Sequence, residues 1–149
     1  VVQNMRHTSV THKISYIPGE SALVYGDPEK IRQVIANLIS NAIKYSPLAG
    51  KVVVTTKLRR DGVVLCVQDF GIGIQKEEQV KVFEQFHRVS ENLQSTFPGM
   101  GIGLYIGSEI IKRHDGKIWV ESSSSKGSVF CMYLPFDYRK KNNRIALIN

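Results

Sequence analysis

The chain has 149 residues, 42% of them hydrophobic, and a formal net charge of +7. This length fits one domain with a real core, and no stretch reaches the roughly 20 apolar residues that a membrane-spanning helix needs, so we predict no direct membrane contact by this segment. The basic residues are spread along the chain, apart from a short cluster of Arg139, Lys140, Lys141 and Arg144, which favours a solvated surface over a nucleic-acid partner.

The first residues predict a linker or edge strand followed by two short strands. Residues 1–12 are polar and weakly patterned, and we place them outside the domain proper. Residues 14–17 and 23–25 are runs of strand-forming residues, and the Pro18-Gly19 turn separates them. The pattern therefore predicts two strands joined by a turn.

A long helix comes next. Asp27 precedes Pro28, which is the arrangement of an N-cap residue followed by proline at the first helical position. Apolar residues then recur at helical spacing as far as Ile43. We expect the helix to end near Tyr45, because Pro47 and Gly50 break the pattern.

The middle of the chain predicts a hairpin and then a loop region. Residues 51–58 and 63–67 are strand-like, and Asp61-Gly62 between them is a hairpin signal. Residues 76–86 carry apolar residues at a spacing that predicts a short helical region. Residues 87–98 are polar and without periodicity, so we predict a mobile loop there.

The last third predicts a second long helix and a final pair of strands. Residues 101–114 have an apolar helical stripe, and Gly116 is placed like a residue that ends a helix. Residues 117–121 and 129–134 are strand-like and are separated by a polar turn. From Pro135 onward the sequence is typical of an exit linker.

This order of elements favours an α+β fold over a doubly wound parallel sheet. Three of the strand connections look like hairpins, which predicts a mixed, mostly antiparallel sheet covered on one face by helices, a two-layer sandwich. We assign the domain to residues 13–136 and a basic linker or tail to residues 137–149.

The two cysteines predict no metal or redox site. Cys66 and Cys131 each lie in an apolar run, without metal-ligand or CxxC spacing. Buried free thiols in a reducing compartment are the simplest interpretation.

One face of the first helix carries polar residues that suit a metal and a phosphate. Asn37, Asn41 and Lys44 stand at i, i+4 and i+7 and share a stripe. An amide oxygen is a hard neutral ligand for Mg²⁺, and a lysine can reach a phosphate as a point charge. Taken alone, the same stripe also fits an ordinary solvated helix face.

Two glycine-containing segments also suit a nucleotide. Asp69 ends a strand pattern and is followed by Gly71 and Gly73, so its carboxylate can accept the amine of adenine while the backbone approaches the ring. Gly101 and Gly103 precede the second helix, where backbone N–H groups and the helix dipole favour an anion. Alone, the two segments fit a tight turn and a hinge.

Together these segments resemble the catalytic domain of sensor histidine kinases, within the ATPase superfamily that includes DNA gyrase, heat-shock chaperones and MutL. The resemblance covers about residues 26–135, and the motifs occur in the family's order. The similar segments are Asn37–Tyr45 for the N box, Asp69–Gly73 for the G1 box, Phe83–Phe86 for the F box and Gly99–Leu104 for the G2 box.

The resemblance implies the Bergerat-type ATP-binding fold, with ATP and Mg²⁺ as cofactors. Asn37 and Asn41 would hold Mg²⁺, and Asn37 and Lys44 would be the catalytic residues. Tyr45 would line the adenine pocket, and Asp69 would bind the adenine amine. The other residues implied to bind ATP are Gly71, Gly73, Ile74, Phe83, Phe86, Arg88, Gly99, Gly101, Ile102, Gly103 and Leu104.

The resemblance also implies a lid over the nucleotide. Residues from about His87 to Gly101 would form it, and Phe83 and Phe86 would anchor its start. Arg88 would contact phosphate.

The phosphoacceptor of such a kinase is not found in this sequence. The family's acceptor histidine precedes an acidic residue on a long dimerising helix, and His114 alone is followed by one, Asp115. Because His114 stands at a predicted helix end, a capping role is favoured. The expected partners are a dimerisation and histidine-phosphotransfer domain of the same protein and a downstream response regulator, with this segment as the cytoplasmic domain of a membrane-bound sensor.

Three alternatives stay open at this point. A gyrase-like ATPase clamp would use a glutamate where Asn37 stands, because an amide cannot act as a general base. A module that binds nucleotide or partners without phosphotransfer, and a serine kinase acting on an anti-sigma antagonist, share the same motifs. The function that we predict ahead of these alternatives is ATP-dependent phosphorylation of a histidine on a separate domain.

Overall fold

A five-stranded sheet forms the main layer of the computed structural model, which describes residues 12–87, 101–123, 126–136 and 145–148. The strand order is β1-β3-β4-β6-β5. β1 runs parallel to β3, and the other neighbouring strands are antiparallel. The strands are β1 (Lys13–Ile17), β3 (Lys51–Arg59), β4 (Gly62–Gln68), β5 (Lys117–Ser123) and β6 (Gly127–Pro135).

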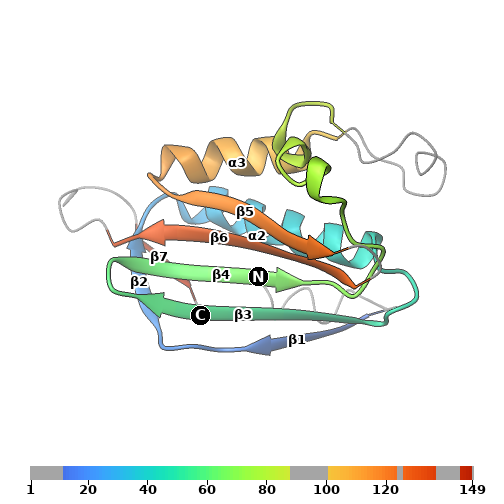
Figure 1. Cartoon of the computed structure of the whole chain (residues 1–149). Helices are drawn as coiled ribbons and strands as arrows, with labels where there is room; N and C mark the ends of the chain where they lie inside the picture. Colours follow the sequence, from blue (N-terminus) through green and yellow to red (C-terminus); the bar gives the residue numbers. More distant parts are fainter. Residues whose placement is uncertain (1–11, 88–100, 124–125, 137–144, 149) are drawn as a thin grey trace.

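The helices lie together on one face of this sheet (Figure 1). They are α2 (Pro28–Lys44) and α3 (Gly103–Arg113), and the short 3₁₀ turns η1 (Lys76–Glu78) and η2 (Lys81–Phe83) lie beside the start of α3. The predicted two-layer α+β architecture is thereby confirmed. None of the described helices is long and apolar enough to cross a bilayer.

A second, two-stranded sheet differs from the sequence prediction. β2 (Ala22–Tyr25) pairs antiparallel with β7 (Ile145–Ile148). The Pro18-Gly19 turn is therefore not a hairpin, because the strands on either side of it pair with different partners. Local turn residues do not specify which strand a segment pairs with, and β7 lies in the segment that the sequence pattern assigned to a tail.

Helix α2 has the caps that its sequence predicts. Asp27 is the N-cap, and its side chain accepts hydrogen bonds from the backbone N–H groups of Glu29 and Lys30. Pro28 occupies the first turn, and Tyr45 is the C-cap. The buried side of the helix packs into the core against the sheet. Its buried residues are Ile31, Val34, Ile35, Leu38, Ile39 and Ala42.

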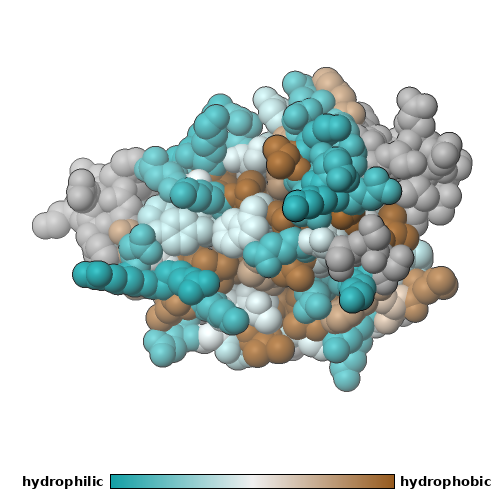
Figure 2. Space-filling model, viewed as in Figure 1, coloured by the Kyte–Doolittle hydropathy of each residue, from teal (hydrophilic) through white to brown (hydrophobic). Residues whose placement is uncertain are grey.

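The two faces of the sheet have different environments. Alternate residues of β4, namely Val63, Leu65 and Val67, point into the core under the helices. The residues between them, including Cys66, point to the helix-free face. Figure 2 shows this face as a mixture of apolar and weakly polar side chains with hydrophilic side chains around it.

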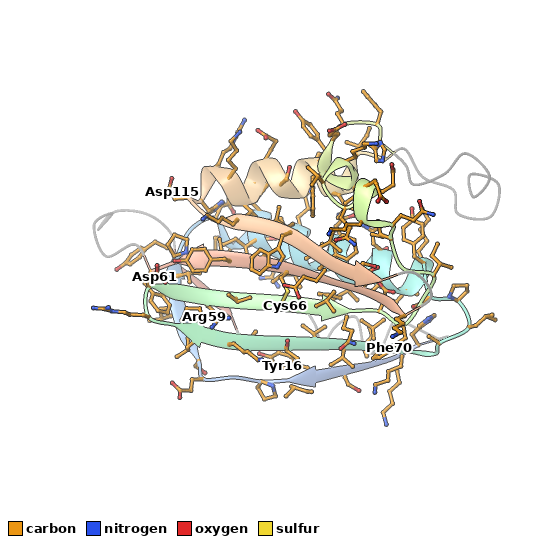
Figure 3. All side chains as sticks on the ribbon, in the orientation of Figure 1. Tyr16, Arg59, Asp61, Cys66, Phe70 and Asp115 are labelled. Carbon is orange, nitrogen blue, oxygen red and sulfur yellow. A yellow bond between two sulfur atoms is a disulfide. The ribbon has the colours of Figure 1, made fainter. Side chains whose placement is uncertain are left out.

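The cysteines form a disulfide on the helix-free face, which contradicts the prediction of free thiols. Cys66 and Cys131 are directly opposite each other in the β4–β6 register, with Cα atoms 4.1 Å apart and the sulfurs bonded. This spacing is that of a pair of residues that exchange no backbone hydrogen bonds, where side chains approach most closely. The sequence pattern did not predict this disulfide because the bond depends on the register of β4 on β6, and 65 residues separate the two cysteines. Figure 3 labels Cys66 in the middle of β4.

His114 links the ends of the two helices. Its Nε2 accepts the backbone N–H of Asp27 at 3.0 Å, and its Nδ1 donates to the carbonyl of Ile110 at 2.7 Å. His114 is the C-cap of α3, and the left-handed residue after it is Asp115, with φ 56°, where the sequence pattern favoured Gly116. The ring therefore joins the end of α3 to the start of α2, in agreement with the predicted capping role.

We expect His114→Ala to lower the free energy of unfolding by about 1–3 kcal/mol, because the Asp27 N–H loses its partner in a partly buried place. Urea unfolding followed by circular dichroism measures the change. The neighbouring Arg113 is exposed, and Arg113→Ala should stay within about 0.5 kcal/mol of the native protein. Equal losses in the two variants would contradict a specific role for the imidazole.

Candidate functional site

Asn37 on α2 lies directly against the start of α3. A Cβ atom added to Gly103 would come within 2.4 Å of Asn37 Oδ1, so a side chain at position 103 would displace this amide. Asn37 and Gly103 are far apart in the sequence, yet they belong to the two segments predicted to hold the metal and the phosphates. The structure thus brings these two segments together.

The Asn37 amide has an unmet hydrogen-bonding capacity. Its Nδ2 is the one buried side-chain nitrogen or oxygen without a partner among the described residues. Leaving such a group unpaired costs about 1–3 kcal/mol. Amide nitrogen and oxygen exchange places by a half-turn of the side chain, so this position suits either a phosphate oxygen or a cation. It therefore fits the predicted role of Asn37 beside Mg-ATP. No group of three or more His, Cys, Asp or Glu residues in the described ranges is placed to hold a metal, so a metal here would depend on amide and phosphate oxygens.

Asp69 is held at the end of β4 by the start of β6. Its Oδ1 accepts the backbone N–H groups of Gly71 at 2.9 Å and Ser128 at 3.1 Å, and its own N–H donates to the Ser128 carbonyl at 2.9 Å. The residue is 3% exposed. Oδ2 makes no hydrogen bond within the described part of the chain, so one oxygen fixes the carboxylate and the other keeps its accepting capacity.

Burial raises the pKa of Asp69 above the ordinary value, against the opposing effect of the N–H groups of Gly71 and Ser128. The folded chain therefore holds this proton more tightly than the unfolded chain does. The free energy of unfolding therefore falls as the pH rises through the folded pKa of Asp69, because the buried carboxyl group then ionises. Below the unfolded pKa the group is protonated in both states, and this loss of stability is absent. A donor arriving at Oδ2, such as an aromatic amine, would offset part of that cost.

The loop after Asp69 packs on the end of α2. A Cβ atom on Gly71 would come within 2.0 Å of the Tyr45 carbonyl oxygen, and the N–H of Ile72 donates to the same oxygen at 3.4 Å. The Lys44 ammonium lies 4.8 Å from the centre of the Tyr45 ring. The predicted adenine-binding loop and the predicted phosphate-binding lysine therefore meet at one end of the helix.

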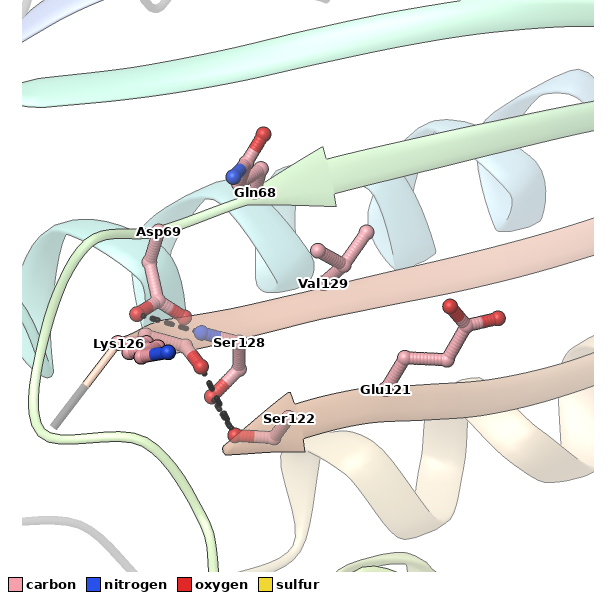
Figure 4. A pocket seen from close by; sticks show the side chains of 8 residues that line it. Gln68, Asp69, Glu121, Ser122, Lys126, Ser128 and Val129 are labelled. Carbon is pink, nitrogen blue, oxygen red and sulfur yellow. Dashed lines mark hydrogen bonds between the residues drawn. The ribbon is translucent and has the colours of Figure 1, made fainter. Parts of the chain in front are cut away.

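A cavity of about 240 Å³ lies beside Asp69, at the ends of three strands (Figure 4). No residue of α2 lines it, so it does not unite Asp69 with Asn41. Figure 4 shows the Asp69 carboxylate and the Ser128 backbone joined at its edge. The lining residues are Gln68, Asp69, Glu121, Ser122, Lys126, Gly127, Ser128 and Val129.

Two serines support the Asp69 loop, and the sequence pattern did not predict this role. The Ser122 hydroxyl accepts the N–H of Ile74 at 2.8 Å and lies 3.0 Å from the Ser128 hydroxyl. Ser128 supplies the backbone groups that hold Asp69. Serines at strand ends carry no distinctive sequence signal, and only the register of β5 on β6 places them here.

The two predicted anchor residues of the lid have different surroundings. Phe83 packs edge-on against Phe130 of the core, with ring centres 6.3 Å apart. Phe86 is 65% exposed and has a φ of 63°. Phe83 is therefore fixed by the core, and the predicted role of Phe86 would require a partner outside the described residues.

An ion-pair cluster lies at the start of the predicted lid. Glu78 accepts from Lys81 at 3.2 Å and lies 2.6 Å from His87 Nε2. Hydrogen bonds from Lys81, and then from His87, lower the pKa of Glu78. The contribution of this carboxylate to stability is therefore present above the ordinary glutamate pKa and is lost as the pH falls through the lowered value.

The remaining predicted ATP-binding residues fall into two groups. Arg88 and Gly99 lie outside the described residues, as does most of the predicted lid. Gly73 and Gly101 have positive φ values of 73° and 67°, Ile102 is the N-cap of α3, and Leu104 packs against the core. Gly73 belongs to the loop after Asp69, and the other three lie at the start of α3.

Comparison with known families and proteins gives one consistent result. Residues 26–138 match the family model described as "Histidine kinase-, DNA gyrase B-, and HSP90-like ATPase". The chain is 36% identical over 132 residues to the sensor histidine kinase WalK of Bacillus subtilis, covering 87% of this chain and 22% of WalK. It is 42% identical over 125 residues to the adaptive-response sensory kinase SasA of Thermosynechococcus vestitus, covering 83% of this chain and 32% of SasA. The chain thus spans less than a third of either relative.

Solved structures show the same architecture. The mycobacterial sensor histidine kinase MprB superposes with a TM-score of 0.73 at 27% identity, over 89% of this chain and 87% of that structure. The nucleotide-free catalytic domain of the histidine kinase ThkA gives a TM-score of 0.73 at 29% identity, over 90% of this chain and 84% of that structure.

Proposed function

Because the chain belongs to the histidine kinase-, DNA gyrase B- and HSP90-like ATPase family, we propose that it binds Mg-ATP and donates the γ-phosphoryl group to a histidine on a separate dimerisation domain. The observation that carries this proposal is that two distant segments meet α2 and its C-cap. Asn37 touches Gly103, and the Tyr45 carbonyl receives the loop that follows Asp69. These are the segments that must act on one nucleotide.

In the proposed complex, each residue acts on one part of ATP. Asp69 Oδ2 accepts the adenine amine, and Tyr45 lines the base pocket. Lys44 contacts phosphate, and the Asn37 and Asn41 amides face the metal-bound phosphates. Mg²⁺, when bound, neutralises charge on the triphosphate. The N–H groups at the start of α3 favour the phosphates through the helix dipole.

The residue at position 37 favours transfer to a protein acceptor over hydrolysis. Asn37 has an amide, which cannot take a proton from water as a carboxylate would. Water attack should therefore be slow, and a nucleophile from another domain is needed. Vigorous ATP turnover by this chain alone would instead support an ATPase clamp of the same family.

The described histidines are engaged in the fold and do not suit an acceptor role. His12 is 6% exposed and donates from Nε2 to the Ser46 carbonyl at 2.8 Å. Both ring nitrogens of His114 have partners, and His87 is bound to Glu78. We therefore propose that the acceptor lies on the dimerisation and histidine-phosphotransfer domain, that a response regulator receives the phosphoryl group, and that this segment is the cytoplasmic part of a membrane-bound sensor.

We expect no stable phosphohistidine on this chain after incubation with Mg²⁺ and radiolabelled ATP. The reason is that its described histidines are held by other groups. Acid-labile label, measured on neutral gels before and after acid treatment, checks this. A purified dimerisation domain of a related sensor kinase provides the positive control, and stable labelling of the isolated chain would refute the proposal.

We expect Asn41→Ala to remove the contribution of Mg²⁺ to ATP affinity. Loss of a metal-facing amide should reduce affinity in the presence of Mg²⁺ by about tenfold, with little change in its absence. Isothermal titration of ATP with and without Mg²⁺ measures both values. Ser40 is exposed on the same helix, so Ser40→Ala is the matched control. An unchanged Mg²⁺ effect in Asn41→Ala would remove Asn41 from the proposed metal site.

A further inference from the structure

The disulfide and the Asp69 contact lie on the same two strands. Cys66 of β4 faces Cys131 of β6, and only two further residue pairs separate this bond from the end of the ladder. At that end, Ser128 holds Asp69 through its N–H and its carbonyl. The covalent link and the proposed adenine-recognition carboxylate therefore belong to one short stretch of the β4–β6 ladder.

We propose that the Cys66–Cys131 disulfide is a redox switch for the nucleotide site, in which the oxidised form holds Asp69 in its binding position. This inference rests on the proposed function of Asp69. It adds a regulatory input, the thiol–disulfide state of the surroundings, to the proposed kinase domain. In a reducing compartment a disulfide is more often a redox sensor than a permanent structural bond.

The mechanical link depends on the distance between strands. Reduction replaces the bond by two thiols, whose sulfur atoms must move apart to non-bonded separation, and this loosens β4 and β6 at the Cys66 position. The Ser128 N–H must stay within hydrogen-bonding distance of Asp69 Oδ1, at present 3.1 Å. Loosening the two strands therefore acts directly on the hydrogen bond from Ser128 that orients the Asp69 carboxylate.

The two sulfurs differ in their accessibility. Cys131 is 4% exposed, while Cys66 is half-buried. Both lie on the face that no described helix covers, and Figure 3 shows this face toward the viewer with Cys66 at its centre. An external reagent therefore meets Cys66 first.

The chemistry is thiol–disulfide exchange with a small dithiol or disulfide. In reduction, a thiolate of dithiothreitol bonds to Cys66 Sγ, the Cys66–Cys131 bond breaks, and Cys131 leaves as a thiolate and takes up a proton. The second thiol of the reagent then closes on the first, which releases Cys66 and oxidises the reagent. In oxidation, the Cys66 thiolate attacks glutathione disulfide, whose S–S bond breaks and releases one glutathione. The Cys131 thiolate then attacks Cys66 Sγ of the mixed disulfide, so that the Cys66–Cys131 bond forms and the second glutathione leaves. The two glutathiones depart as thiols with the two cysteine protons.

The test compares ATP affinity in the two redox states of the intact chain. Samples equilibrated with glutathione disulfide or with dithiothreitol are titrated with Mg-ATP, and alkylation followed by mass spectrometry counts the free thiols. We expect the oxidised form to bind ATP at least about fivefold more tightly, the lower end of coupling between linked sites. Cys66→Ala should bind equally in both conditions, at the affinity of the reduced native protein.

Hydrogen exchange separates failure of the switch from failure of the proposed function. The amide of Ser128 donates to Asp69 and the amide of Asp69 donates to Ser128, so both should exchange at least about fivefold more slowly in the oxidised chain. If neither form binds ATP but exchange differs in this way, the nucleotide assignment fails and the conformational switch stands. Equal exchange and equal affinity in the two forms, or two free thiols after oxidation, would overturn the switch.

Discussion

Replacing Asp69 with asparagine is expected to weaken ATP binding about 100-fold while the fold stays intact. The asparagine oxygen can still accept from Gly71 and Ser128, which hold Oδ1 in the native protein. The second oxygen, however, becomes an N–H₂ donor, and it would face the donor amine of adenine. Loss of a hydrogen bond to a buried charged group costs about 1.5–3 kcal/mol, and the upper end of this range corresponds to the expected loss.

Titration of ATP into both proteins measures this effect, and thermal unfolding shows whether the variant is folded. Because burial raises the pKa of Asp69, removing the charge should leave the melting temperature unchanged or raise it. Glu77→Gln is the control, since it removes the same charge at an exposed position outside the proposed site. An Asp69→Asn variant that binds ATP within threefold of the native chain would place adenine recognition elsewhere.

The second large effect concerns stability. Under oxidising conditions, we expect the double variant Cys66→Ala/Cys131→Ala to lose about 4 kcal/mol of unfolding free energy. The disulfide closes a loop across 65 residues, and restricting the unfolded chain over a loop of that length is worth about this much in the chain-entropy model. Guanidinium unfolding at fixed pH, with the thiols counted in each sample, measures the difference.

The native chain in dithiothreitol provides the matched comparison. It lacks the cross-link but keeps both sulfur atoms, so the double variant should lie within about 1 kcal/mol of it. A double variant as stable as the oxidised native protein would mean that the bond restricts the unfolded chain very little.

Local sequence signals predicted the elements whose structure is decided locally. Asp27-Pro28 set the start of α2, and the apolar spacing set its buried side. The hairpin between β3 and β4 also follows from its turn, although the loop is Arg60-Asp61 and Gly62 already belongs to β4. In each case the residues that decide the outcome are near neighbours in the chain.

Features that depend on register or distant pairing were not predicted. The alignment of β4 on β6 decides two of these features. It pairs Cys66 with Cys131, and it brings Ser128 within hydrogen-bonding distance of Asp69. The pairing of β2 with β7 joins opposite ends of the chain. Hydrophobic periodicity shows which residues face the core but does not show which strand lies beside which.

The roles of the predicted site residues stay predictions, while the structure shows which of these residues lie together. The contacts of Asn37 with Gly103 and of Gly71 with Tyr45 join predicted motifs, whereas the roles of Arg88, Gly99 and most of the lid lie beyond the described residues. Sequence identified residue types suited to ATP, because amides, carboxylates and glycines have distinct chemistry. It did not identify Ser122 and Ser128, because their contribution comes from position.

The hydrogen bonds of His114 have a consequence for reaction order. With both ring nitrogens bonded to Asp27 and Ile110, this side chain helps to hold two helices together, and in the proposed transfer the phosphoryl group goes to a histidine on a separate domain. The rate of transfer should then depend on the effective concentration of the acceptor at the nucleotide. A short flexible linker between the two domains raises this concentration to the millimolar range. Separated into two pieces and diluted to micromolar levels, donor and acceptor should react far more slowly than when covalently joined.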